Sequence, residues 1–191
     1  MKKTEKKRRE LIEKLAAYLL ANGLQQSSLR RLAAAIGTSD RMLLHYFTNK
    51  EDLMNAALSA LATQLEDILT NTRAEPMPFE VLVPHLAAFV ADPRIQPFTR
   101  LWLEITARAS AGETTMTTVA SEIMTSFYQW VSNNLRVEDP AFREPLAGLA
   151  LATVEGCVLL EAVGGETKIK SAMAGLALLT KGTLSEPEQL G

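Results

Sequence analysis

The residues best suited to specific chemistry are grouped in one segment near the N-terminus. Residues 28–50 read SLRRLAAAIGTSDRMLLHYFTNK and are rich in cationic and hydrogen-bonding side chains. Side chains of this kind neutralise phosphates and contact the edges of bases in the major groove of DNA. The candidate DNA-contacting residues are Ser28, Arg30, Thr38, Ser39, Arg41, His45, Tyr46 and Lys50.

Two short helices are expected to position these side chains. Ser28 is a favourable N-cap for a first helix, which Gly37 ends, and Ser39 is a favourable N-cap for a second helix that reaches Tyr46. The small residues Ala33, Ala34 and Gly37 allow the two helices to cross closely. A helix, a tight turn and a short second helix with a polar N-terminal end are typical of a helix-turn-helix.

The charge distribution favours the same interpretation. The chain of 191 residues has a net charge of −2, but residues 1–50 hold eleven Lys/Arg and four Asp/Glu, a balance of +7. The remaining residues hold nine Lys/Arg and eighteen Asp/Glu, a balance of −9. A basic head on an acidic body suits a DNA-binding head, although residues 2–9 alone are equally compatible with a solvated basic tail.

Residues 28–50 and the helix before them resemble the N-terminal domain of TetR-family repressors. The resemblance rests on the apolar first helix, Gly23-Leu24, Ser28-Leu29-Arg30, Ala33, Gly37-Thr38-Ser39, and Tyr46-Phe47 followed by Lys50. It covers about the first quarter of the chain, and the remainder matches only in helical plan and total length. It implies a dimeric DNA-binding regulator in which Ser28 and Lys50 contact phosphates at helix N-termini.

Other positions in this segment have more than one interpretation. Arg41 and His45 are candidates for base edges or nearby phosphates, and Tyr46 is a candidate phosphate donor. Arg30 is a further candidate, or it belongs with Arg31 to a solvated helix face. Asp40 is either a partner of the helix dipole or an acceptor for a cytosine amino group. Leu44 stands where the family often has a tyrosine, so that hydroxyl contact is missing here.

Helical periodicity dominates the whole chain, and no segment shows sustained strand alternation. We therefore expect an all-α fold of about nine helices, with Thr48 and Glu51 forming the capping box of the fourth. The predicted helices cover about residues 3–22, 29–36, 40–46, 49–73, 79–91, 93–111, 114–136, 145–163 and 167–181. The expected domains are a three-helix DNA-binding domain at 1–49 and a helical ligand-binding and dimerisation domain at 50–191.

Two C-terminal helices carry small and apolar residues at helical spacing. Positions four apart lie on one face, and a glycine-rich face lowers helix propensity unless another helix approaches closely. We expect these faces to form a four-helix dimer interface, as the resemblance also implies, with packing inside one subunit as the alternative. The interface residues would be Gly148, Ala152, Gly156, Leu160, Ala172, Gly175 and Leu179.

Most of the aromatic residues lie between positions 79 and 130, which suits the binding of an apolar ligand. Polar residues on otherwise apolar faces are further candidates, because a buried carboxylate needs a partner. The candidate ligand-binding residues are His85, Phe89, Phe98, Trp102, Glu104, Phe127, Trp130 and Glu155. The alternative for each aromatic residue is an ordinary place in the core. The alternatives for each polar residue are a pairing with Arg100 or Arg108 and a place on the surface.

Several function classes find no support in the sequence. There is no GxSxG, P-loop, HExxH or CxxC motif, so neither an enzyme nor a metal or cofactor site is expected. Cys157 is the single cysteine, which favours a reducing, cytoplasmic location. Residues 146–165 are apolar, but Glu155 and Glu161 favour a buried helix of a soluble protein over a membrane span.

These observations predict a sequence-specific transcriptional regulator that acts as a homodimer. We expect a repressor that a small, largely apolar effector releases from a near-palindromic operator. The alternative is a dimeric DNA-binding regulator without a small-molecule ligand, in which the C-terminal body serves only dimerisation or protein binding.

Overall fold

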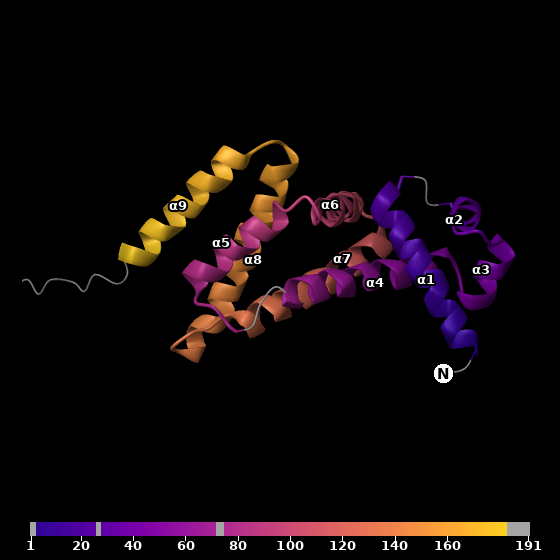
Figure 1. Cartoon of the computed structure of the whole chain (residues 1–191), viewed down its shortest axis with the longest axis horizontal. Helices are drawn as coiled ribbons and strands as arrows, with labels where there is room; N and C mark the ends of the chain where they lie inside the picture. The colour runs from indigo at the N-terminus through magenta and orange to yellow at the C-terminus, as the bar shows by residue number, and fades with distance from the viewer. Residues whose placement is uncertain (1–2, 26–27, 72–74, 183–191) are drawn as a thin grey trace, which may run out of the picture. The chain divides into compact units, whose positions relative to one another are not determined.

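The computed structural model describes residues 3–25, 28–71 and 75–182, and within them it confirms the all-α fold class (Figure 1). Nine α-helices and one 3-10 helix account for the regular structure there, together with an isolated bridge between Met77 and Leu135. The helices are α1 (Lys3–Asn22), α2 (Leu29–Ala35), α3 (Asp40–Tyr46), α4 (Lys50–Asn71), α5 (Phe79–Val90), α6 (Gln96–Ser110), α7 (Thr114–Asn134), η1 (Pro140–Phe142), α8 (Arg143–Ala162) and α9 (Glu166–Gly182).

The chain divides into two compact units that each draw on two stretches of sequence. Unit 1 comprises Met1–Ala74 and Gln96–Phe127, and unit 2 comprises Glu75–Ile95 and Tyr128–Gly191. The expected boundary at residues 49–50 falls inside unit 1, where α4 begins. A division into domains at that point therefore stays a proposal about function, separate from the division by packing.

The core of unit 1 is built on one face of α1. Leu11, Leu15 and Leu19 recur at intervals of four and are buried, because positions four apart lie on the same side of a helix. They pack against α4 and α6, and the same core takes in Leu32 from α2 and Leu43 from α3. Only one or two buried side chains hold each of these short helices in place. Most of the surface of both helices therefore lies outside the core.

A glycine turn sets the angle between α2 and α3. Gly37 has a φ of +72°, a conformation that residues with a Cβ atom adopt at a cost. The N–H of Gly37 donates to the carbonyl of Ala34, and the N–H of Thr38 donates to that of Ala33, which closes the end of α2. The predicted helix-turn-helix is therefore present, and its turn depends on glycine.

In unit 2, α5 packs against α8 and α9. The buried face of α5 includes Leu82, Val83 and Leu86, and α8 meets it mainly with small and branched residues. Cys157 lies in this core, where burial raises the pKa of its thiol. A thiol that is buried and protonated is a poor nucleophile, so its role is packing.

Three helix boundaries differ by two or three residues from the approximate predicted ones, and two of these differences have a local reason. α6 begins at Gln96 and not at residue 93, because the Asp92 carboxylate accepts from the N–H and Nε of Arg94 in a tight turn. This pairing lowers the pKa of Asp92 to about 2. α7 ends at Asn134, whose carbonyl accepts from the N–H of Met77, while the N–H of Arg136 donates to the carbonyl of Met77. α8 begins earlier than expected, after η1.

The sequence predicts a buried α8, and in the single chain this helix is buried on one face only. The segment Pro140–Ala162 is long and apolar enough to span a membrane by length and composition, a test that core helices of soluble proteins also pass. Only 28% of its most apolar window is buried. The other face of α8 therefore exposes apolar surface that needs an explanation.

The turn geometry yields a first prediction. Gly37→Ala is expected to lower the free energy of unfolding by about 1–2 kcal/mol, because alanine resists a positive φ. Among the described residues, no atom beyond the two chain neighbours lies within 4 Å of where the new Cβ would sit, so the expected cost is backbone strain. Gly37→Asn is the matched control and should lose less, since asparagine tolerates this conformation better. Urea unfolding followed by circular dichroism measures both, and equal stability of all three proteins would contradict the prediction.

Candidate nucleic-acid interface

Serine hydroxyls cap both helices of the helix-turn-helix. Ser28 Oγ accepts from the N–H of Arg31 at 3.4 Å, and Ser39 Oγ accepts from the N–H of Met42 at 3.1 Å. Both serines remain exposed. A hydroxyl that accepts one hydrogen bond still has a proton to donate, so each can also contact a phosphate oxygen.

The outward face of α3 is formed by exposed side chains on the side opposite Leu43. At 3.6 residues per turn, Arg41 and His45 point almost directly away from the buried Leu43. Both are exposed, and so is Asp40, whose Oδ1 accepts from the N–H of Arg41 at 2.9 Å. That contact supports a capping role for Asp40 at the start of the helix.

The remaining candidates lie around this face. Arg30 is exposed on α2, Thr38 is half-buried in the turn, and Lys50 is half-buried at the first position of α4. The half-buried Tyr46 packs against His45 in an edge-to-face arrangement, with ring centroids 4.9 Å apart. The eight predicted residues therefore all belong to unit 1, on α2, the turn, α3 and the beginning of α4.

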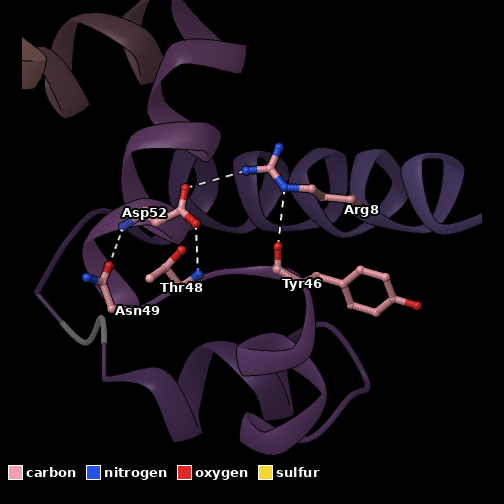
Figure 2. Close-up of polar contacts among 5 residues, drawn as sticks. All are labelled: Arg8, Tyr46, Thr48, Asn49 and Asp52. Atoms are coloured by element: carbon pink, nitrogen blue, oxygen red, sulfur yellow. Dashed lines mark hydrogen bonds and ion pairs between the residues drawn. The ribbon is translucent and has the colours of Figure 1, made fainter.

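Arg8 of α1 ties the end of α3 to the start of α4 (Figure 2). Its Nε donates to the carbonyl of Tyr46 at 3.3 Å, and its Nη2 lies 3.5 Å from the carboxylate of Asp52. The same guanidinium sits 4.8 Å above the ring of Phe47, a cation–π arrangement. Because these contacts converge on one side chain, Arg8 fixes where the outward face of α3 lies relative to α1.

The predicted capping box of Thr48 and Glu51 is wrong by one residue. Asn49 is the cap, since its Oδ1 accepts from the N–H of Asp52 at 2.8 Å. Asp52 Oδ2 accepts in return from the N–H of Thr48 at 2.9 Å, as Figure 2 shows. Asparagine caps helices as well as threonine or better, and the aspartate three positions on also serves Arg8.

Two side chains of α6 hold the link between α1 and α2. Glu104 Oε2 accepts from the N–H of Leu24 at 2.7 Å, and Arg108 Nη2 donates to the carbonyl of the same residue at 2.7 Å. Gly23, with a φ of +70°, makes room for this contact, because a Cβ there would clash with the carboxylate of Glu104. Glu104, predicted as a ligand contact, thus has a partner in the backbone of its own unit.

The predicted ligand-binding residues divide between the two units. Phe98, Trp102, Glu104 and Phe127 belong to unit 1, and His85, Phe89, Trp130 and Glu155 belong to unit 2. Phe98 and Trp102 are part of the packed core of unit 1, which is the ordinary role that the sequence left open for them. In unit 2, His85 and Phe89 lie four positions apart on α5 and are half-buried.

A hollow of about 300 Å³ opens on the surface of unit 2, and none of the predicted ligand residues lines it. Its walls are formed by Glu75, Pro76, Asn133, Leu135, Arg136, Val137 and Arg143. The guanidinium of Arg143 donates hydrogen bonds to the carbonyls of Ser132 and Leu135. Across residues 3–25, 28–71 and 75–182, no three His, Cys, Asp or Glu side chains are grouped so as to hold a metal ion.

The residues predicted to form the dimer interface lie on α8 and α9, all in unit 2. Ala152, Gly156, Ala172 and Leu179 are exposed, and the other three are half-buried. A Cβ at Gly148, Gly156 or Gly175 would meet no atom within 4 Å. Within the described part of one subunit, therefore, no neighbouring helix lies against these glycines.

Comparison with protein families identifies the N-terminal part of the chain. The family of bacterial regulatory proteins named tetR matches residues 11–57, which run from α1 to the first two turns of α4. The match assigns this N-terminal segment, about a quarter of the chain, to the tetR family. The helix-turn-helix at residues 29–46 lies within the matched segment. No curated protein matches the sequence significantly.

Solved structures share the fold over nearly the whole chain. A TetR-family transcriptional regulator from Cytophaga hutchinsonii is 19% identical with a TM-score of 0.73, covering 95% of this chain and 96% of its own. A transcriptional regulator from Rhodococcus sp. Rha1 is 21% identical with a TM-score of 0.69, covering 92% and 96%. The multidrug binding protein EbrR, complexed with imidazole, is 19% identical with a TM-score of 0.65, covering 96% and 93%.

Sequence reasoning missed the residues that support the TetR helix-turn-helix from outside it. The sequence indicates Arg8 only as part of a basic tail, and Arg108 only as a possible partner of a carboxylate such as Glu104. Their contacts reach Tyr46 and Leu24, which lie 38 and 84 positions away along the chain. The only local signal is the Gly23-Leu24 pair, whose glycine marks a turn.

The contact of Glu104 with Leu24 generates the second prediction. Glu104→Ala removes the acceptor of a part-buried backbone N–H and should lower the free energy of unfolding by about 1–3 kcal/mol. Glu104→Gln keeps an acceptor oxygen and should lose less. Glu113→Ala is a control on the exposed partner of Arg108, 3.9 Å away, and should change stability by less than about 1 kcal/mol. Equal urea unfolding of the Glu104→Ala and Glu113→Ala variants would contradict the assigned role.

Proposed function

We propose that this regulator is a dimeric repressor that binds a near-palindromic operator and is released by a small, largely apolar ligand. The observation that carries the proposal is the helix-turn-helix of unit 1, whose second helix buries Leu43 and exposes Arg41 and His45. A helix that buries one side and presents cationic and polar groups on the other fits the major groove.

The proposed DNA contacts follow from position and chemistry. Ser28 and Lys50 contact phosphates, since they lie at the N-termini of α2 and α4, where backbone N–H groups and the helix dipole favour an anion. Thr38, Ser39 and Arg30 border the same surface and donate to the phosphate backbone. Tyr46 donates its hydroxyl, and Arg41 and His45 contact base edges.

The exposed faces of α8 and α9 support the proposed dimer. Large apolar side chains there are 51% to 73% exposed in the single chain, namely Leu149, Leu159, Val163, Leu178 and Leu179. Beside them, Gly148, Ala152, Gly156, Leu160, Ala172 and Gly175 allow a second copy to approach closely. A two-fold axis through these faces would give a four-helix interface and pair two helix-turn-helix units on one operator.

The effector is proposed to bind among half-buried residues of the helical body. The candidates in unit 2 are His85 and Phe89 on α5, Trp130 on α7 and Glu155 on α8, and Phe127 on α7 is a separate candidate in unit 1. The fold resembles that of EbrR, a multidrug binding protein, and this likeness supports a small-molecule effector. The candidate role of Phe98, Trp102 and Glu104 is indirect, since they belong to the packing of α6 in unit 1.

Coupling between effector and operator is proposed to run through α4 and α6. α4 begins at Lys50 beside the helix-turn-helix, and α6 holds the backbone of Leu24 through Glu104 and Arg108. A ligand that binds one position of these helices better than another would shift the operator-binding population. The alternative is a regulator without such a ligand, whose body serves only dimerisation or protein binding. In either case we propose a cytoplasmic protein without catalytic activity.

The third prediction concerns operator recognition. Purified protein incubated with random duplex DNA should enrich a near-palindrome. The logarithm of its association constant should fall linearly with the logarithm of the salt concentration, with a slope of about −0.9 per phosphate contact. Arg41→Ala should weaken binding about 5- to 150-fold for each half-site and relax base preference, as expected for the loss of a bidentate base contact. Glu113→Ala, in the same unit but exposed on the α6–α7 link, serves as the control. Failure to enrich any sequence would reject the proposed specific binding.

The fourth prediction concerns the dimer. Leu159→Glu should weaken self-association at least 100-fold, because two-fold symmetry removes the apolar burial of a leucine twice, at about 1.5–3 kcal/mol each. Val81→Glu, an equally drastic change at an exposed position of α5, should leave the dimer intact. Analytical ultracentrifugation over a range of concentrations gives both constants. Unchanged association of the Leu159→Glu protein would place the interface elsewhere.

A further inference from the structure

α3 exposes two large apolar side chains that the proposed DNA contacts leave unexplained. Met42 is 44% exposed and Leu44 is 51% exposed, while the only other large aliphatic residue of the helix, Leu43, is fully buried. Isolated apolar side chains on a protein surface are common and need no explanation by themselves. What matters here is where these two lie on the helix.

Helical geometry places them on either side of the cationic centre of α3. A rotation of about 100° per residue puts Leu44 and Met42 on opposite flanks of the helix, each beside the pair Arg41 and His45. The outward face is therefore polar along its middle and apolar along both edges. A helix seated in the major groove by Arg41 and His45 would bring both apolar flanks against neighbouring base pairs.

The major groove offers one kind of apolar partner. Base-pair edges present nitrogen and oxygen donors and acceptors there, and the C5 methyl group of thymine is the exception. A leucine pressed against a donor or acceptor would strip that group of water without replacing the hydrogen bond, which costs free energy. Against a methyl group the same contact removes apolar surface from water, which is favourable.

We propose that Leu44 and Met42 contact thymine methyl groups and so select A·T pairs beside the positions contacted by Arg41 and His45. The proposal rests on the proposed function, namely that α3 lies in the major groove of an operator. It adds a specificity that the polar residues do not supply. It also gives Leu44 a positive role at the position where a tyrosine hydroxyl is missing.

The test removes single methyl groups from DNA. In the site enriched from random duplexes, each thymine of the half-site is replaced by deoxyuracil in both half-sites, and affinity is measured by fluorescence anisotropy. Loss of one buried methyl should weaken wild-type binding about fourfold, which corresponds to ~0.8 kcal/mol. The symmetric pair of replacements should weaken it about 15-fold, at one thymine position for Leu44 and another for Met42.

Variants assign each methyl contact to its side chain. Leu44→Ala should bind more weakly than wild type and be insensitive to uracil at one position, and Met42→Ala should be insensitive at the other, as in a double-mutant cycle. Both residues are exposed, so the variants are expected to fold, and thermal unfolding checks this. Val81→Ala, an exposed apolar residue in unit 2, should keep the full uracil effect at both positions.

The outcomes separate this inference from the function on which it rests. If no sequence is enriched, the proposed operator binding fails and this inference fails with it. If a site is enriched but uracil is neutral at every thymine, or weakens wild type and the Leu44→Ala, Met42→Ala double variant equally, only the thymine contact is overturned. Enriched half-sites without thymine would overturn it as well.

Discussion

The structure of unit 1 depends on the burial of one face of α1. Leu11, Leu15 and Leu19 form a stripe that α4 and α6 cover, and the short helices α2 and α3 attach to the same core through Leu32 and Leu43. Helices of seven residues have too few internal hydrogen bonds to be stable alone, so their geometry comes from this packing. The functional surface of α3 is consequently whatever remains outside the core.

Polar contacts then fix the angle and position that apolar packing leaves adjustable. Arg8 binds the carbonyl of Tyr46 and the carboxylate of Asp52, while Glu104 and Arg108 bind both backbone groups of Leu24. Hydrogen bonds to the backbone are directional, whereas hydrophobic burial is not. The helix-turn-helix is therefore held at both of its ends by side chains from α1 and α6.

Unit 2 shows the complementary case, in which a helix has more apolar surface than its own chain covers. α8 buries Ala147, Ala150, Val154 and Cys157 against α5 and leaves a second apolar face open. On that open face, a Cβ added to Gly148 or Gly156 would meet no described atom within 4 Å. Small residues that weaken a helix without helping its own subunit are what the proposed dimer would require, because they let a helix of a second copy approach closely.

The sequence by itself determined the helices, the glycine turn and the outward face of α3, because these depend on periodicity and capping within a few residues. Gly37, Ser39 and Leu43 could be assigned from local pattern alone. Only the tertiary structure decided that Glu104 serves the backbone of Leu24, that Arg8 joins α3 to α4, and that α4 and α6 pack with the helix-turn-helix. The physical reason is that a charged side chain on a half-apolar helix has several possible partners, and chain folding over tens of residues selects one of them.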